Sequence, residues 1–171
     1  WIIDPIDGTG NFAAGNPPFG IMVALADAGT TLAGWILDPL TGRLCHALLG
    51  GGSHIDGQAV RAKESGGDLP IAALAVYFMT AEERADIQRR AEGAFAVVDI
   101  PRCAAEQYPR LVLGQNDVSV FARTLPWDHA AGTLFVNEAG GCCQRLDGTP
   151  YVVGDLRRGL LGASSPRLWD Q

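Results

Sequence analysis

Twelve residues at the start of the chain, WIIDPIDGTGNF (residues 1–12), decide how the rest of the sequence is interpreted. An apolar run reaches a carboxylate at Asp4, a second carboxylate follows at Asp7, and Gly8 and Thr9 open a short segment with helical character. Asp-Pro and Asp-Gly pairs by themselves are typical of turns. Two carboxylates so close together repel one another unless a cation lies between them. The combination therefore predicts a cation site where a strand meets a helix.

Two other stretches act as controls for that interpretation. Asp38-Pro39 repeats the Asp-Pro pair, and Asp147-Gly148-Thr149 repeats the Asp-Gly-Thr sequence. Each lies between runs that look like hairpin strands, without a second carboxylate and a following helix. We expect ordinary turns at both places.

The residue types of the opening stretch indicate which ion and which ligand to expect. Carboxylate oxygens are hard ligands that favour Mg²⁺, Mn²⁺ or Ca²⁺ over zinc. In proteins, Mg²⁺ is usually held by one or two carboxylates together with water and a substrate phosphate. The backbone N–H groups of Gly8 and Thr9, at a helix N-terminus, suit an anion beside that cation.

A third carboxylate, Asp128, begins a predicted helix in the stretch WDHAAG (residues 127–132). The small residues after it allow another element to approach closely. An N-cap role, worth about 1 kcal/mol, explains Asp128 as well as a ligand role does. The two carboxylates of the opening stretch favour the ligand role for Asp128.

Composition limits the classes of function. The chain has 171 residues, 47% of them hydrophobic, which is enough to bury a core of ordinary size. Thirteen Lys and Arg against nineteen Asp and Glu leave a net charge of −6, which argues against a nucleic-acid partner. No apolar run approaches the ~18 residues of a membrane span, and the four cysteines form no Cys-x-x-Cys pair. We expect a cytoplasmic protein without a zinc site or a membrane partner.

Turn residues divide the chain into predicted elements of two kinds. A strand from Trp1 ends at Pro5, an antiparallel meander covers residues 19–26, 31–37 and 42–49, and a polar connection covers residues 50–68. Helices and strands then alternate: strands over residues 69–78, 94–101 (buried), 117–123 and 159–163, and helices over residues 80–93, 102–115 (interrupted at Pro109) and 126–141. This pattern predicts an α/β chain forming a single domain over residues 1–171. Because the chain starts inside a strand and without Met, we expect a further segment upstream.

Two separated motifs resemble the inositol monophosphatase family, which comprises magnesium-dependent, lithium-sensitive sugar-phosphate phosphatases. DPIDGTGNF (residues 4–12) is similar to the family's first metal motif, and WDHAAG is similar to its second, roughly 120 residues later. The stretch AGWILDPLTGRLCHALLGGG (residues 33–52) also resembles the family's meander. The resemblance implies alternating layers of helix and sheet, with the N-terminal helices and part of the first sheet missing. It also implies a homodimer.

The resemblance implies a metal site of two or more Mg²⁺ ions, with Mn²⁺ as a possible substitute and Li⁺ as an inhibitor. Asp4 would bridge two metals, the Ile6 carbonyl would contact the first, and Asp7 and Asp128 would contact the second. Cations shared in this way activate a water and neutralise the leaving oxygen of a phosphate ester.

The resemblance also implies how a small phosphorylated metabolite is held. Gly8, Thr9 and Ala104 would contact the substrate, and the Thr9 hydroxyl would orient the attacking water. The expected activity is hydrolysis of a small polyol or sugar phosphate monoester. Histidinol-phosphate and nucleotide-bisphosphate phosphatases of the same superfamily are alternatives.

Departures from the family pattern leave further alternatives open. The family's Gly-Glu-Glu motif would lie upstream of Trp1, so a non-catalytic protein that binds metal or phosphate is a second hypothesis. RCAAEQ (residues 102–107) stands where the family usually has Gly-Ser-Ala-Ala-x-Asp, and Phe121 stands where many members have a Glu that contacts inositol. Arg102 and Arg123 either bind a second anionic group or, as we favour, form surface ion pairs. We expect His129 on the surface of its helix.

Overall fold

Six consecutive strands form an antiparallel sheet, sheet A, in the order of the chain. In this computed structural model, which describes all 171 residues, the order is β1-β2-β3-β4-β5-β6. The strands are β1 (Ile2–Asp7), β2 (Gly20–Asp27), β3 (Thr30–Leu37), β4 (Leu44–Leu48), β5 (Gly52–Ile55) and β6 (Gln58–Val60). Ala28 and Gly29 connect β2 and β3 with φ values of 45° and 84°, which is the backbone that a two-residue hairpin turn requires. The predicted meander is confirmed.

The second half of the chain forms a mixed sheet, sheet B, in the order β10-β11-β9-β7-β8. The strands are β7 (Ile71–Ala75), β8 (Ala96–Val98), β9 (Val118–Phe121), β10 (Cys142–Gln144) and β11 (Leu160–Ala163). β7 pairs in parallel with β8 and β9, because a helix connects each strand to the next. These helices are α2 (Ala81–Ala91) and α3 (Ala104–Val112).

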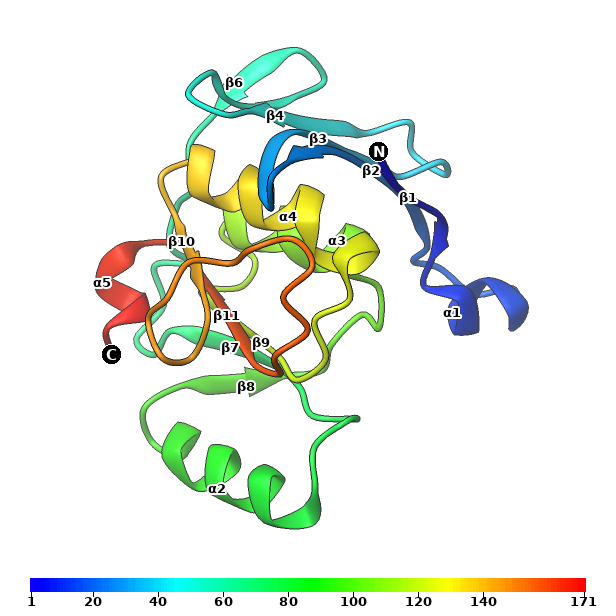
Figure 1. Ribbon diagram of the computed structural model, residues 1–171. Helices are drawn as coiled ribbons and strands as arrows, with labels where there is room; N and C mark the ends of the chain where they lie inside the picture. Colours follow the sequence, from blue (N-terminus) through cyan, green and yellow to red (C-terminus); the bar gives the residue numbers. More distant parts are fainter.

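Helices α3 and α4 (Pro126–Glu138) lie between the two sheets, and α2 lies beyond sheet B (Figure 1). The larger core cluster contains Met22 and Ile36 from sheet A, Tyr108 from α3, Phe135 from α4 and Leu160 from sheet B. A smaller cluster lies between sheet B and the short C-terminal helix α5 (Pro166–Trp169). The predicted α/β fold with alternating layers is confirmed.

Glycine allows the closest helix contact of this core. A Cβ built on Gly132 in α4 would lie closer than 3.0 Å to three atoms of the Tyr108 ring in α3. Real Cβ atoms essentially never approach other atoms so closely. The last residue of WDHAAG therefore sets the separation of α3 and α4.

Four local predictions differ from the structure. β1 continues past Pro5 to Asp7, because a register shift between Asp4 and Asp7 accommodates a residue that has no N–H to donate. The connection over residues 50–68 contains β5 and β6, which pair through a turn at Asp56 and Gly57. β8 is exposed, since it forms an edge of sheet B. Helix α3 passes through Pro109, and the Leu113 N–H still donates to the Pro109 carbonyl at 2.8 Å.

Helix α2 begins with a capping box. The Thr80 hydroxyl accepts from the Glu83 N–H at 3.2 Å, and the Glu83 carboxylate accepts from the Thr80 N–H at 2.7 Å. Between α2 and sheet B lies a mostly apolar cavity of about 570 Å³.

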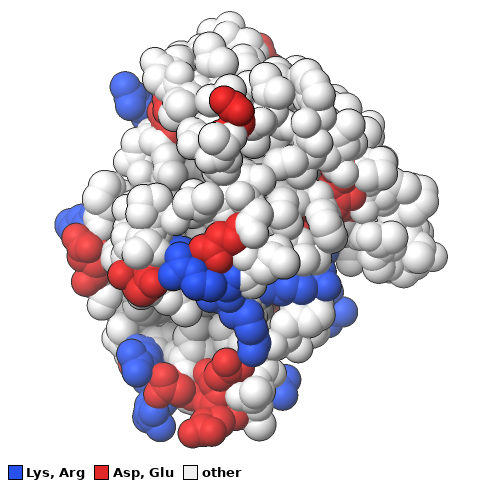
Figure 2. Space-filling view, in the orientation of Figure 1, with Lys and Arg blue, Asp and Glu red and all other residues white.

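Charged side chains are unevenly distributed on the face shown in Figure 2. They gather over the half of the molecule that contains sheet B and α2, and few lie over sheet A. None of the helices has the length and apolar character needed to cross a membrane.

Candidate active site

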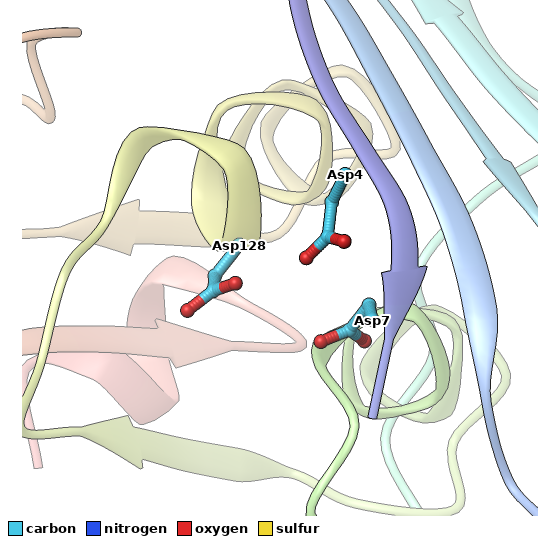
Figure 3. Close-up of side chains that lie close together, drawn as sticks. All are labelled: Asp4, Asp7 and Asp128. Carbon is cyan, nitrogen blue, oxygen red and sulfur yellow. The ribbon is translucent and has the colours of Figure 1, made fainter. Parts of the chain in front are cut away.

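Three carboxylates from two distant parts of the chain point toward one space (Figure 3). Asp4 lies within β1, Asp7 ends that strand, and Asp128 lies in the first turn of α4. One ligand oxygen from each carboxylate lies within 4.8 Å of the others. The structure therefore brings together the three acidic residues that the two motifs supply.

The turn after β1 shapes the site beside these carboxylates. The Ile6 N–H donates to the Asp4 carboxylate at 3.0 Å, and the Thr9 hydroxyl donates to the Ile6 carbonyl at 3.2 Å. Gly8 is in the left-handed region with φ 79°, and a Cβ there would lie 3.2 Å from the Cys103 Cβ. Gly8 thus permits the backbone to turn and brings Thr9 back over Ile6. The helix that follows is α1 (Thr9–Ala13).

Asp7 is fixed by the start of α3. Its carboxylate, on a residue only 7% exposed, accepts from the Ala105 N–H at 2.7 Å and from the Cys103 thiol at 3.0 Å. The Asn11 amide also bridges this region by donating to the Pro101 carbonyl at 2.9 Å. The sequence analysis missed the contact between Cys103 and Asp7. The available signal was that Cys103 stands where the family has a Ser, another side chain that can donate a hydrogen bond.

The N-cap explanation of Asp128 is wrong. Leu125 is the N-cap residue of α4, and Asp128 lies three positions further on, with its backbone N–H donating to the Leu125 carbonyl at 3.1 Å. Pro126 begins the helix because its missing N–H is not needed in the first turn. The Asp128 side chain is therefore directed at the other two carboxylates (Figure 3).

The prediction that His129 lies on the helix surface is also wrong, since only 2% of this residue is exposed. Its Nε2 donates to the Arg123 carbonyl at 2.8 Å, so its Nδ1 accepts from the Tyr108 hydroxyl at 2.6 Å. Burial lowers the pKa of His129 to about 4, which agrees with a neutral ring in this arrangement. His129 holds the segment before α4 against α3.

A buried arginine that the sequence analysis did not identify supports the same segment. Arg145 is 2% exposed and donates to the Thr124 hydroxyl at 2.9 Å and to the Asp155 and Arg157 carbonyls at 2.6 Å each. These contacts tie the loop after β10 to the residues just before α4. No local pattern around Arg145 distinguishes it from a surface arginine.

The electrostatics of the three carboxylates suit a divalent cation. Burial raises the pKa of Asp7, and burial together with the charge of Asp7 raises the pKa of Asp128 to about 7. One basic group forms an ion pair with this cluster: the Arg123 guanidinium lies 3.7 Å from the Asp128 carboxylate. Negative charge at the cluster is thus under-compensated. An all-oxygen donor set of this kind fits Mg²⁺ or Mn²⁺.

The cluster opens into a pocket of about 830 Å³. Gly8, Thr9 and Ala104, the residues expected to contact substrate, line it together with Phe121 and Trp127. The Ile6 carbonyl accepts from the Thr9 hydroxyl, but Ile6 is not among the residues that line this pocket. Apart from Ile6, the predicted residues therefore surround one cavity, which is large enough for a small phosphorylated metabolite.

The known proteins that this chain is similar to include inositol monophosphatases, Nus factors and a histidinol-phosphatase. The chain is 30% identical over 172 residues to the inositol-1-monophosphatase of Bacillus subtilis (strain 168), a match that covers 96% of this chain and 63% of that protein. It is 32% identical over 173 residues to the Nus factor SuhB of Vibrio cholerae, covering 98% of this chain and 63% of the relative.

The fold has a close counterpart among solved structures. An inositol monophosphatase from Zymomonas mobilis superimposes with a TM-score of 0.89 at 22% identity, covering 99% of this chain and 67% of the other. The chain spans about 63% of the length of the relatives from Bacillus subtilis and Vibrio cholerae. The model of the inositol monophosphatase family matches residues 1–170. With both motifs, the layered fold and this match in agreement, the chain belongs to the inositol monophosphatase family.

Proposed function

We propose that the protein is a magnesium-dependent phosphomonoesterase acting on a small sugar, polyol or related phosphate. The observation that carries the proposal is the cluster of Asp4, Asp7 and Asp128 at a pocket whose wall includes the Gly8-Thr9 turn. Membership of a phosphatase family supports the same reaction.

The three carboxylates and the Ile6 carbonyl would hold the metal ions. Bound Mg²⁺ would supply positive charge to the phosphate oxygens and lower the pKa of a water molecule. Asp7 is held by the Ala105 N–H and the Cys103 thiol, so its carboxylate is oriented before any ion arrives. Asp128 is directed by the first turn of α4, beside the buried His129.

The remaining residues would position the ester and the water. The Gly8 and Thr9 backbone N–H groups and the start of α3 at Ala104 would contact the phosphate. The Thr9 hydroxyl donates to the Ile6 carbonyl, so its oxygen lone pairs remain available to accept from an attacking water. Such a hydrogen bond would help to orient the water toward phosphorus.

A second candidate function is metal or phosphate binding without hydrolysis. The observation that favours it is that a relative 32% identical to this chain is named as a Nus factor rather than as a phosphatase. Such a protein would retain the carboxylate cluster and bind Mn²⁺ while releasing no phosphate.

Phosphate release distinguishes the two candidates. We would express the protein from its complete reading frame and incubate it with inositol, sugar, histidinol and nucleotide phosphates, in Mg²⁺ and in EDTA. The phosphatase proposal expects release that requires Mg²⁺ and is lost in Asp128→Asn. Asp27→Asn, at the exposed end of β2, is the matched control and should retain activity. Mn²⁺ binding by calorimetry without hydrolysis of any substrate would favour the second candidate.

We further propose that residues 1–171 act as one domain of a cytoplasmic homodimer that Li⁺ inhibits. Family membership supports the homodimer and the lithium sensitivity, and the cysteine usage supports a reducing compartment. Analytical ultracentrifugation of the full protein tests the dimer, and phosphate release in LiCl against KCl tests the inhibition.

A further inference from the structure

Two guanidinium groups lie on the wall of the candidate active site, and both stack on aromatic rings. The Arg102 guanidinium lies 4.3 Å from the centre of the Tyr77 ring, and the Arg123 guanidinium lies 4.2 Å from the centre of the Phe78 ring. All four residues line the pocket that contains the three carboxylates. Such a cation–π contact holds a guanidinium group in place without using its N–H groups as hydrogen-bond donors.

The backbone of Arg102 is held in an unfavourable conformation at this position. Its φ is 54°, in the left-handed region that residues with a Cβ rarely adopt. The neighbours on both sides are anchored to the turn after β1: the Pro101 carbonyl accepts from Asn11, and the Cys103 thiol donates to Asp7. The structure therefore fixes the point from which the Arg102 side chain enters the pocket.

The ion pairs of the two arginines differ from the surface pairs expected from the sequence. Arg102 has no carboxylate within 4.0 Å, so its charge is uncompensated, while Arg123 has Asp128 at 3.7 Å. Outside the three-carboxylate cluster, the charged residues that line the pocket are these two arginines alone. The protein as a whole carries a net charge of −6 and therefore repels anions, whereas this wall of the pocket carries two positive charges.

Part of the same wall is apolar. Phe121, which lines it, is 6% exposed and has no polar atom on its side chain. Gln107 also lines the pocket, and its amide nitrogen donates to the Ala73 carbonyl at 3.4 Å. Phe121 therefore offers no hydrogen bond to a polyol hydroxyl, whereas the two guanidinium groups offer paired donors that suit a carboxylate or a phosphate.

We propose that the substrate carries a second anionic group, a carboxylate or a second phosphate, which binds Arg102 with the help of Arg123. The inference rests on the proposed function, since it places the hydrolysed phosphate at the carboxylate cluster. Guanidinium groups bind carboxylate and phosphate through paired N–H donors, and their aromatic supports lower the entropy lost on binding.

Non-hydrolysable phosphonates test the inference without relying on turnover. We would measure, by calorimetry of the full protein in Mg²⁺, the affinities of propylphosphonate, 3-phosphonopropanoate and propane-1,3-bisphosphonate, and of the corresponding five-carbon series. Within a series the ligands differ only in the group at the far end. In at least one of the two series, we expect a ligand that carries a second anion to bind at least tenfold more tightly than the alkylphosphonate. Whether the carboxylate or the bisphosphonate binds more tightly shows which second anion the site prefers.

Variants assign that preference to the two side chains. The quantity compared is the affinity of the ligand with a second anion divided by that of the alkylphosphonate. Arg102→Gln should reduce this ratio toward one, and Arg123→Gln should reduce it by a smaller factor. Arg89→Gln, on the exposed face of α2, should leave it unchanged. A ratio near one in both series of the unaltered protein, a ratio that survives both pocket variants, or no binding of any phosphonate would overturn the inference. A second-anion preference without phosphate release from any substrate would instead refute the proposed function and leave the inference standing.

Discussion

Replacing Gly132 with Ala tests whether the contact between α3 and α4 is as tight as the structure indicates. The new Cβ would lie closer than 3.0 Å to three ring atoms of Tyr108, a residue with no exposed surface. The ring cannot simply move aside. It stacks on Phe121 at 5.1 Å between ring centres, and its hydroxyl donates to His129 at 2.6 Å.

The expected cost follows from three contributions. Forcing extra volume into a packed core costs about 1 to 3 kcal/mol. If the ring shifts, the buried hydroxyl loses its partner, at about 1 to 3 kcal/mol. Ala favours the helix over Gly by about 1 kcal/mol, which offsets part of this. We therefore expect a loss of about 3 kcal/mol, equivalent to a fall in melting temperature of about 6 to 12 °C for a domain of this size.

Urea unfolding and thermal melting of the full protein give the measurement. The matched control is Gly10→Ala in α1, where an added Cβ meets nothing within 4 Å, and this variant should be neutral or slightly stabilising. Combining Gly132→Ala with Tyr108→Ala should cost less than the sum of the two single changes, because the clash is then absent. A Gly132→Ala variant within 1 kcal/mol of the unaltered protein would refute the reasoning.

Three further predictions concern the cap of α2, the buried arginine and the carboxylate cluster. Thr80→Ala removes the hydroxyl half of the capping box and should lower the unfolding free energy by about 1 kcal/mol in urea, whereas an unchanged midpoint would contradict the role of the cap. Arg145→Met leaves the Asp155 and Arg157 carbonyls without their donor and should destabilise by about 3 kcal/mol; melting temperatures within error of the unaltered protein would count against it. In EDTA, the pKa of Asp128 in the folded protein is about 7, above its ordinary value of 3.8. The contribution of Asp128 to the free energy of unfolding is therefore complete at low pH and is lost as pH rises through about 7. The melting temperature in EDTA should therefore fall between about pH 4 and pH 7 relative to Asp128→Asn and level off above pH 7. Saturating Mg²⁺ should reverse the fall, and parallel profiles for the two proteins would argue against it.

Local signals in the sequence determined most of the elements and the family. The alternation of apolar residues and the turn residues between them predicted the meander, and the stretch over residues 80–93 predicted helix α2, because each signal acts within a few residues. The stretch over residues 4–12 and the one over residues 127–132 identified the family and predicted which carboxylates gather. The metal and substrate roles of those residues stay predictions.

Tertiary structure alone decided how those signals combine. Whether Asp128 caps its helix or faces Asp4 depends on where α4 meets β1, and the partners of Asp7 lie in α3, almost one hundred residues away. The same holds for His129 and Arg145, whose burial comes from elements that pack over them, and for β8, whose exposure follows from its place at a sheet edge. Periodicity and composition report a residue's own preferences, whereas burial and partnership depend on segments distant in the chain.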